Sequence, residues 1–97
     1  MEIRIENSEN RSVVAVAGRL DTNTAVELDG ALGSITASEV IVDCAALEYV
    51  SSAGLRVILA THKRLSAAQC RLVLRGVRAE VRSVFDMTGF SHILNIE

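Results

Sequence analysis

Several short runs of the chain are almost wholly apolar, and each has the length of a single β-strand. Residues 12–18 (SVVAVAG) and 39–45 (EVIVDCA) carry apolar side chains at nearly every position, which is typical of parallel strands covered on both faces. Residues 70–76 (CRLVLRG) predict a further strand. In residues 1–6 (MEIRIE), isoleucines alternate with charged residues, which predicts a strand with one buried face. The turn at residues 6–11 is short, so we expect the first two strands to pair antiparallel.

Three segments between or after these runs change to a helical period. Residues 20–35 contain several possible N-caps before the apolar positions begin, and Gly33 can close the helix. The clearest helix follows the Ser-Ser-Ala-Gly sequence at residues 51–54. Residues 77–89 predict a third helix, with Gly89 at its C-terminal cap. The positions expected to face the core are Ala25, Leu28, Leu32 and Ile35, then Leu55, Ile58, Leu59, His62 and Leu65, then Val77, Val81, Val84 and Phe85.

The order of these elements defines a fold class. Residues 92–97 (HILNIE) are long enough for one last short strand, so the order is ββαβαβαβ. Strands that alternate with helices predict an α/β domain with a mixed, mostly parallel sheet and helices packed on it. The chain has 97 residues, no proline and no low-complexity linker. We therefore expect one domain over residues 1–97.

Composition excludes several classes of function. A net charge of −2, only three aromatic residues and no Lys/Arg cluster argue against a nucleic-acid-binding protein. No apolar run approaches the roughly 18 residues of a membrane span, and the charged N-terminal residues do not resemble a signal peptide. Cys44 and Cys70 are too far apart for a metal motif and are expected to be small buried residues. We expect a cytoplasmic protein without a membrane partner.

Enzyme motifs are also absent. His62 is expected to be buried with its hydrogen bonds satisfied, and it lies ten residues beyond Ser52, about 15 Å along a helix. It therefore cannot serve Ser52 as a catalytic base, and no Gly-x-Ser-x-Gly or nucleotide-binding glycine motif is present. Asp21 and Asp43 end two predicted strands, where sites gather in parallel sheets. They could hold a weakly bound Mg²⁺, but helix capping and loop hydrogen bonds explain them as well, so we predict no catalytic residue, metal or cofactor.

The serines before the second helix permit a different kind of chemistry. Ser52 is expected to be the N-cap, but no Glu or Gln stands three residues later to complete a capping box. Gly54 is unusual in a first helical turn, and a bare backbone there would leave the serine accessible. Leu55 is expected to anchor the turn in the core, while Arg56 points away. A helix N-terminus tolerates an anion, so a phosphate on Ser52 would add charge without unfolding the domain.

Three longer segments resemble the STAS family, specifically single-domain bacterial anti-sigma-factor antagonists. Residues 18–28 (GRLDTNTAVEL) are similar to a Gly-x-Leu-Asp-x-x-Thr-Ala stretch of that family. Residues 40–59 (VIVDCAALEYVSSAGLRVIL) are similar to its central strand, loop and helix, and residues 72–90 to its fourth strand and third helix. The likeness spans nearly the whole chain, and the middle segment is its most specific part.

The resemblance implies a non-catalytic partner switch. In such systems the unphosphorylated antagonist binds an anti-sigma factor that is also a serine kinase. Phosphorylation of the antagonist releases it, and a PP2C-type phosphatase restores it. Aligning on Gly54 places the phosphoacceptor at Ser52, with Ser51 as the alternative. The residues expected to line the partner-binding edge are Asp21, Thr22, Asp43, Ser51, Gly54, Leu55 and Arg56.

Two other functions stay open from the sequence. One is a constitutive scaffold or a small-ligand-binding STAS domain that is never phosphorylated. The other is a small enzyme, such as a nucleotide hydrolase, that uses the edge near Asp21 and Asp43. Nothing in the sequence requires more than a monomer.

Overall fold

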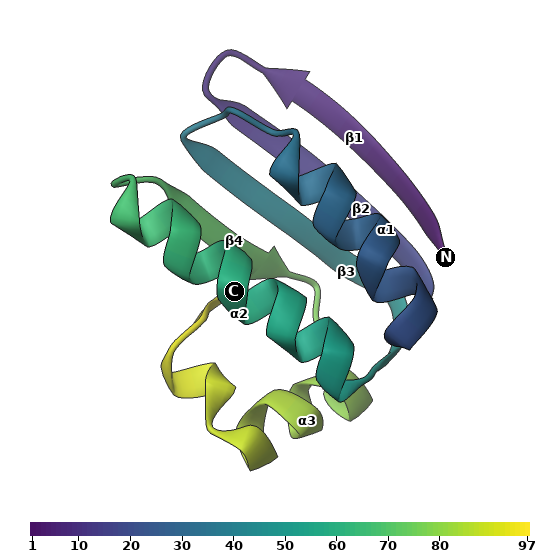
Figure 1. Cartoon of the computed structure of the whole chain (residues 1–97). Coiled ribbons are helices and arrows are strands. Elements are labelled where there is room, and N and C mark those ends of the chain that lie inside the picture. The colour runs from purple at the N-terminus through teal and green to yellow at the C-terminus, as the bar shows by residue number, and fades with distance from the viewer.

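The computed structural model describes all 97 residues as a layer of helices over one β-sheet (Figure 1). The strands alternate with helices after the first hairpin, as the sequence predicts, so the order ββαβαβαβ is confirmed. A short 3-10 turn, Phe90–His92, precedes the last strand. The strands are β1 (Glu2–Ser8), β2 (Arg11–Leu20), β3 (Glu39–Val50), β4 (Arg71–Arg75) and β5 (Asn95–Ile96), and the helices are α1 (Thr22–Gly33), α2 (Ser52–Ala67) and α3 (Ala79–Thr88).

The sheet is mixed and mostly parallel. Its strands lie side by side in the order β1-β2-β3-β4-β5. Only β1 and β2 pair antiparallel, through the short turn at residues 9–10, and the other three pairs are parallel. The C-terminal ends of β2 and β3 therefore lie at the same edge, where α1 and α2 begin (Figure 1).

All three helices pack on the same face of the sheet. One cluster of 19 buried residues joins their apolar sides to alternate positions of the strands. Phe85 of α3 and Leu28 of α1 are fully buried in it, together with Val14 of β2 and Leu74 of β4. The alternation follows from strand geometry, because successive side chains point to opposite faces of a sheet. None of the three helices could span a membrane.

The opposite face of the sheet carries no helix, which corrects the expectation that the central strands are covered on both faces. Val13, Ala15 and Ala17 of β2 are only half-buried there. Ile41 of β3 and Val73 of β4 are buried on this face but do not belong to the core cluster. Two ion pairs between neighbouring strands also lie on this face: Arg11 of β2 with Glu39 of β3, and Arg75 of β4 with Asp43 of β3. This face of the sheet therefore carries charged and small apolar side chains and is not covered by helices.

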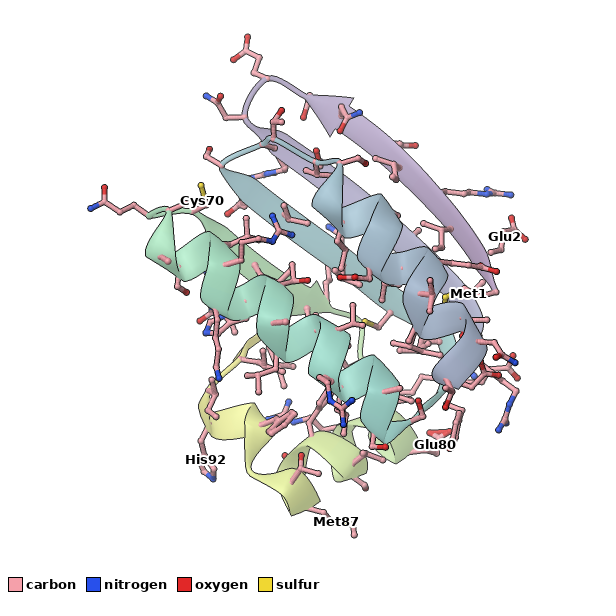
Figure 2. All side chains as sticks on the ribbon, in the orientation of Figure 1. Met1, Glu2, Cys70, Glu80, Met87 and His92 are labelled. Carbon is pink, nitrogen blue, oxygen red and sulfur yellow. The ribbon has the colours of Figure 1, made fainter.

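The two cysteines differ in burial. Cys44 of β3 is 1% exposed, and burial raises the pKa of its thiol to about 12. Cys70 precedes β4 and is only half-buried at the periphery of the molecule, so its expected full burial was wrong (Figure 2). Both thiols are free.

Candidate functional site

The first turn of α2 begins one residue earlier than the sequence indicates. Ser51 is the N-cap: its backbone is extended, with φ −90° and ψ 172°, and its hydroxyl oxygen accepts a hydrogen bond from the N–H of Gly54 at 3.2 Å. The N–H of Ser51 donates to the carbonyl oxygen of Leu20 at 2.8 Å, which joins this cap to the end of β2. The assignment of the N-cap to Ser52 was therefore wrong, and Ser52 is the first residue of the helix.

This shift separates the roles of the two serines. The hydroxyl of Ser51 is half-buried and occupied in capping the helix. Ser52 is exposed, and its hydroxyl makes no hydrogen bond within the chain. It also lies at the positive end of the α2 dipole, among the unpaired N–H groups of the first turn. Of the two serines, only Ser52 presents a free hydroxyl to an approaching protein.

Gly54 fulfils a packing requirement and does not expose the serine. It is buried, and a Cβ atom at this position would lie 2.5 Å from Cγ of Leu20 and 3.1 Å from its carbonyl oxygen. The first turn of α2 can therefore approach β2 this closely only with glycine. Leu55 is 5% exposed and anchors the same turn in the core, as predicted. Neither residue offers a side chain to a partner, which corrects their place among the docking residues.

Asp21 caps the neighbouring helix α1. Its Oδ1 accepts hydrogen bonds from the N–H groups of Asn23 and Thr24, both at 3.0 Å. The N–H of Asp21 in turn donates to Oγ1 of Thr24, which completes a capping box. The hydrogen bonds from Thr24 hold the pKa of the Asp21 carboxyl below its usual value. Asp21 thus aligns the start of α1 beside that of α2 and makes no hydrogen bond to either serine.

This cap predicts a pH-dependent contribution to stability. Asparagine at position 21 keeps a side-chain oxygen for the cap but removes the charge, so Asp21→Asn should lower the midpoint of thermal unfolding at pH 6. Because the folded-state pKa of Asp21 is lowered, the advantage of wild type is fully present above about pH 4 and is lost as pH falls through the folded pKa. Thermal unfolding between pH 2 and pH 7 measures the difference. Asp29→Asn, on the same helix, controls for the loss of one negative charge. A constant difference across this range would contradict the prediction.

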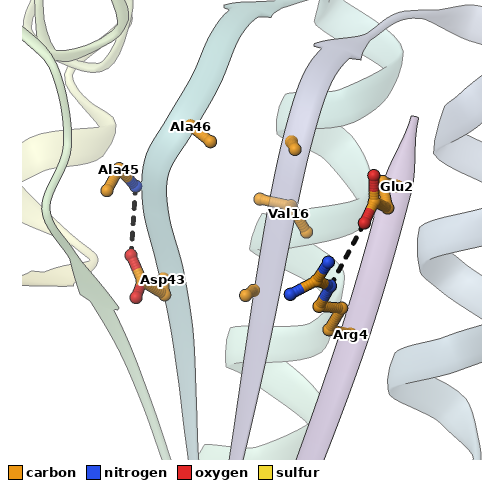
Figure 3. Close-up of a pocket in the computed structure, with 8 residues that line it drawn as sticks. Glu2, Arg4, Val16, Asp43, Ala45 and Ala46 are labelled. Atoms are coloured by element: carbon orange, nitrogen blue, oxygen red, sulfur yellow. Dashed lines mark hydrogen bonds and ion pairs between the residues drawn. The ribbon is translucent and has the colours of Figure 1, made fainter.

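Asp43 lies outside this site, contrary to its expected place at the same edge. β3 continues to Val50, so Asp43 is in the middle of the strand, roughly 25 Å from Ser51 along the chain. It faces the uncovered side of the sheet, where it pairs with Arg75 at 3.3 Å and accepts the N–H of Ala45 at 3.1 Å. Figure 3 shows it across a shallow pocket of about 300 Å³ from the Glu2–Arg4 ion pair.

A shallow groove between α1 and α2 is lined by Ala53, the residue that follows Ser52. Its volume is about 210 Å³. Val26 of α1 lines it and is 73% exposed, although its neighbours Ala25 and Leu28 are buried. Sequence reasoning missed Val26, and the available signal was an apolar residue lying outside the buried stripe of α1. The residues that line the groove are Thr22, Ala25, Val26, Asp29, Ala53, Arg56 and Val57.

The arrangement does not supply hydrolytic or metal chemistry to Ser52. His62 lies ten residues further along α2, and its buried Nδ1 has no hydrogen-bond partner, so the expectation of a satisfied histidine was wrong. His92 projects from the 3-10 turn after α3, at the outside of the molecule (Figure 2). No three His, Cys, Asp or Glu side chains are grouped as metal ligands. What the site offers is an exposed hydroxyl at a helix start, beside a small groove.

Comparison with known proteins identifies the class that this fold and site define. Residues 3–95 match the family described as Mlab, STAS domain. The anti-sigma-B factor antagonist of Listeria monocytogenes is 34% identical to this chain, over all of it and 90% of that protein. The structure of an anti-sigma factor antagonist from Mycobacterium paratuberculosis superposes with a TM-score of 0.88 at 25% identity, over 98% of this chain and 83% of that one. The Bacillus protein SpoIIAA in its phosphorylated form shares the fold, with a TM-score of 0.78 at 18% identity over 99% of this chain and 91% of its own.

The class that the comparisons define is that of STAS domains, and the relatives named here are anti-sigma factor antagonists. The chain belongs to the STAS domain family, which confirms the resemblance found in the sequence.

Proposed function

We propose that this protein is a non-catalytic anti-sigma factor antagonist whose binding is controlled by phosphorylation of Ser52. The observation that carries the proposal is the difference between the two serines. Ser51 is held in the N-cap by the N–H of Gly54, whereas Ser52 is exposed and unbonded. The relatives named as anti-sigma factor antagonists, and a related fold described in a phosphorylated form, support the same function.

The modification is a phosphoryl transfer carried out by the partner. A serine kinase, which is itself the anti-sigma factor, brings a nucleoside triphosphate to the exposed hydroxyl. Ser52 Oγ forms a bond to the γ-phosphorus, the bond from that phosphorus to the β,γ-bridging oxygen breaks, and the nucleoside diphosphate leaves. A base on the kinase takes the hydroxyl proton. A PP2C-type phosphatase hydrolyses the phosphoserine and restores the hydroxyl.

The docking surface consists of the two helix starts and the groove between them. Thr22 and Val26 of α1 and Arg56 of α2 are exposed along it, and Ser52 directly precedes Ala53, which also lines the groove. A phosphate on Ser52 adds about −1.5 to −2 charges to the start of α2, within this docking surface. The added charge weakens the complex by repulsion and by the cost of removing water from the phosphate. The fold itself tolerates the phosphate, because it sits at a helix N-terminus.

Intact-mass measurement of the protein from its own cells tests the proposal. We expect an increment of about 80 Da that phosphatase removes, which corresponds to one phosphate. Peptide mapping should place it on Ser52, and the increment should persist in Ser51→Ala and vanish in Ser52→Ala. A phosphate on Ser51 would contradict the assignment of the site. No increment under any growth condition would contradict the phosphorylation switch and favour a constitutive STAS scaffold.

A further inference from the structure

Arg56 is an exposed cation one helical turn beyond Ser52, and it has no partner in the fold. The four ion pairs of the structure use Arg4, Arg11, Arg75 and Arg82. Arg56 takes part in none of them, and its guanidinium makes no hydrogen bond, although Asp29 lines the same groove. Its charge is therefore free to bind an incoming anion.

Helix geometry places this cation within reach of Ser52. Residues four apart lie on the same helix face, about 6 Å apart along the axis. Long side chains in a helix lean toward its N-terminus, so Arg56, four residues after Ser52, can reach back over the turn that Ser52 begins. An acidic group that precedes a basic one by four residues is also the favourable order for a helical ion pair.

We propose that Arg56 binds the phosphate of phosphorylated Ser52 within the same chain, a pair that rests on the proposed modification of Ser52. The planar guanidinium donates two parallel N–H bonds to phosphate oxygens. The first-turn N–H groups that have no helical partner face the same phosphate.

If Arg56 pairs with the phosphate on Ser52, phosphorylation changes the charge of the docking surface in two ways. In the unmodified protein, Arg56 lines the groove between α1 and α2 and can contact a carboxylate of the partner. In the phosphorylated protein, the same guanidinium is held by the phosphate, so the partner loses a cation as well as meeting an anion.

The test uses the full chain with phosphoserine inserted at position 52 during translation. The second pKa of the phosphate, about 6 when unperturbed, is followed by ³¹P NMR titration. A cation beside the phosphate favours its dianion and lowers this pKa. We expect the pKa to rise by about 0.3 of a unit or more in Arg56→Gln. The pKa should stay unchanged in Lys63→Gln, which removes an exposed cation roughly 16 Å from Ser52 along the axis of α2.

The NMR resonance of the Arg56 side chain gives a second, independent measurement. The Arg56 Nε–H resonance should shift on phosphorylation in wild type and remain in place in the unphosphorylated Ser52→Ala protein. Equal phosphate pKa values in all three phosphorylated proteins, or equal shifts in Arg56→Gln and Lys63→Gln, would overturn the proposed pair. Both substitutions are at exposed positions, so unmodified variants should unfold at the wild-type temperature. Because translation inserts the phosphoserine, the result is independent of whether a cellular kinase modifies Ser52.

Discussion

Substituting alanine for Gly54 is expected to lower the free energy of unfolding by roughly 1–2 kcal/mol. The new methyl group would lie 2.5 Å from Cγ of Leu20, and Leu20 is completely buried and cannot swing away into solvent. Overpacking of this kind costs about 1–3 kcal/mol, which exceeds the helix propensity that alanine gains over glycine, at most about 1 kcal/mol. Thermal unfolding should show a midpoint lowered by about 5–15 °C.

Gly30→Ala is the matched control, and it should have the opposite sign. Gly30 is an exposed residue inside α1, and a Cβ atom there would have no neighbour within 4 Å. Alanine should therefore stabilise the protein by about 0.5–1 kcal/mol through helix propensity alone. If Gly54→Ala were as stable as wild type, the close approach of α2 to β2 would not be a constraint. If Gly54→Ala and Gly30→Ala both stabilised the protein, the close approach of α2 to β2 would likewise not require glycine.

The order and the inward faces of the elements could be predicted because they depend on local patterns. The helical period of α1 identified Ala25, Leu28 and Leu32, all of which are buried. Gly89 was predicted to close α3, and it has a φ of 80°, a left-handed conformation that glycine adopts without strain. Each of these features is set by neighbours within one or two turns of the chain.

The errors arose where distant segments decide the local structure. The N-cap falls on Ser51 because its N–H bonds to the carbonyl oxygen of Leu20, thirty-one residues earlier. β3 extends past Asp43 to Val50 because β2 pairs with it over this whole length, across shifts in register. No pattern in residues 43–50 shows that pairing. The small side chains of Ala15 and Ala17 suit a covered or an uncovered face equally, so continuous apolarity in β2 gave no indication that helices cover only one side.

Replacing Ser52 with aspartate is expected to weaken binding to the proposed anti-sigma kinase by about 100-fold or more. A charge introduced into a close protein contact costs several kcal/mol, and 1.4 kcal/mol corresponds to a factor of ten in affinity. Ser52→Ala should bind as tightly as wild type, because the Ser52 hydroxyl makes no hydrogen bond in the fold. This variant also lacks the hydroxyl that would be phosphorylated. Isothermal titration calorimetry with the kinase measures both affinities in the absence of nucleotide.

Stability and affinity should move in opposite directions in Ser52→Asp, which separates loss of binding from loss of folding. Aspartate in the first turn of α2 interacts favourably with the helix dipole and should raise stability by about 0.3–1 kcal/mol. Ser66→Asp is the positional control, since Ser66 is an exposed residue near the other end of α2. It should leave affinity unchanged, while the negative charge near the helix C-terminus should lower stability slightly. Equal affinity of Ser52→Asp and wild type would contradict a switch centred on this hydroxyl. An equal loss of affinity in Ser66→Asp would instead indicate a general response to negative charge.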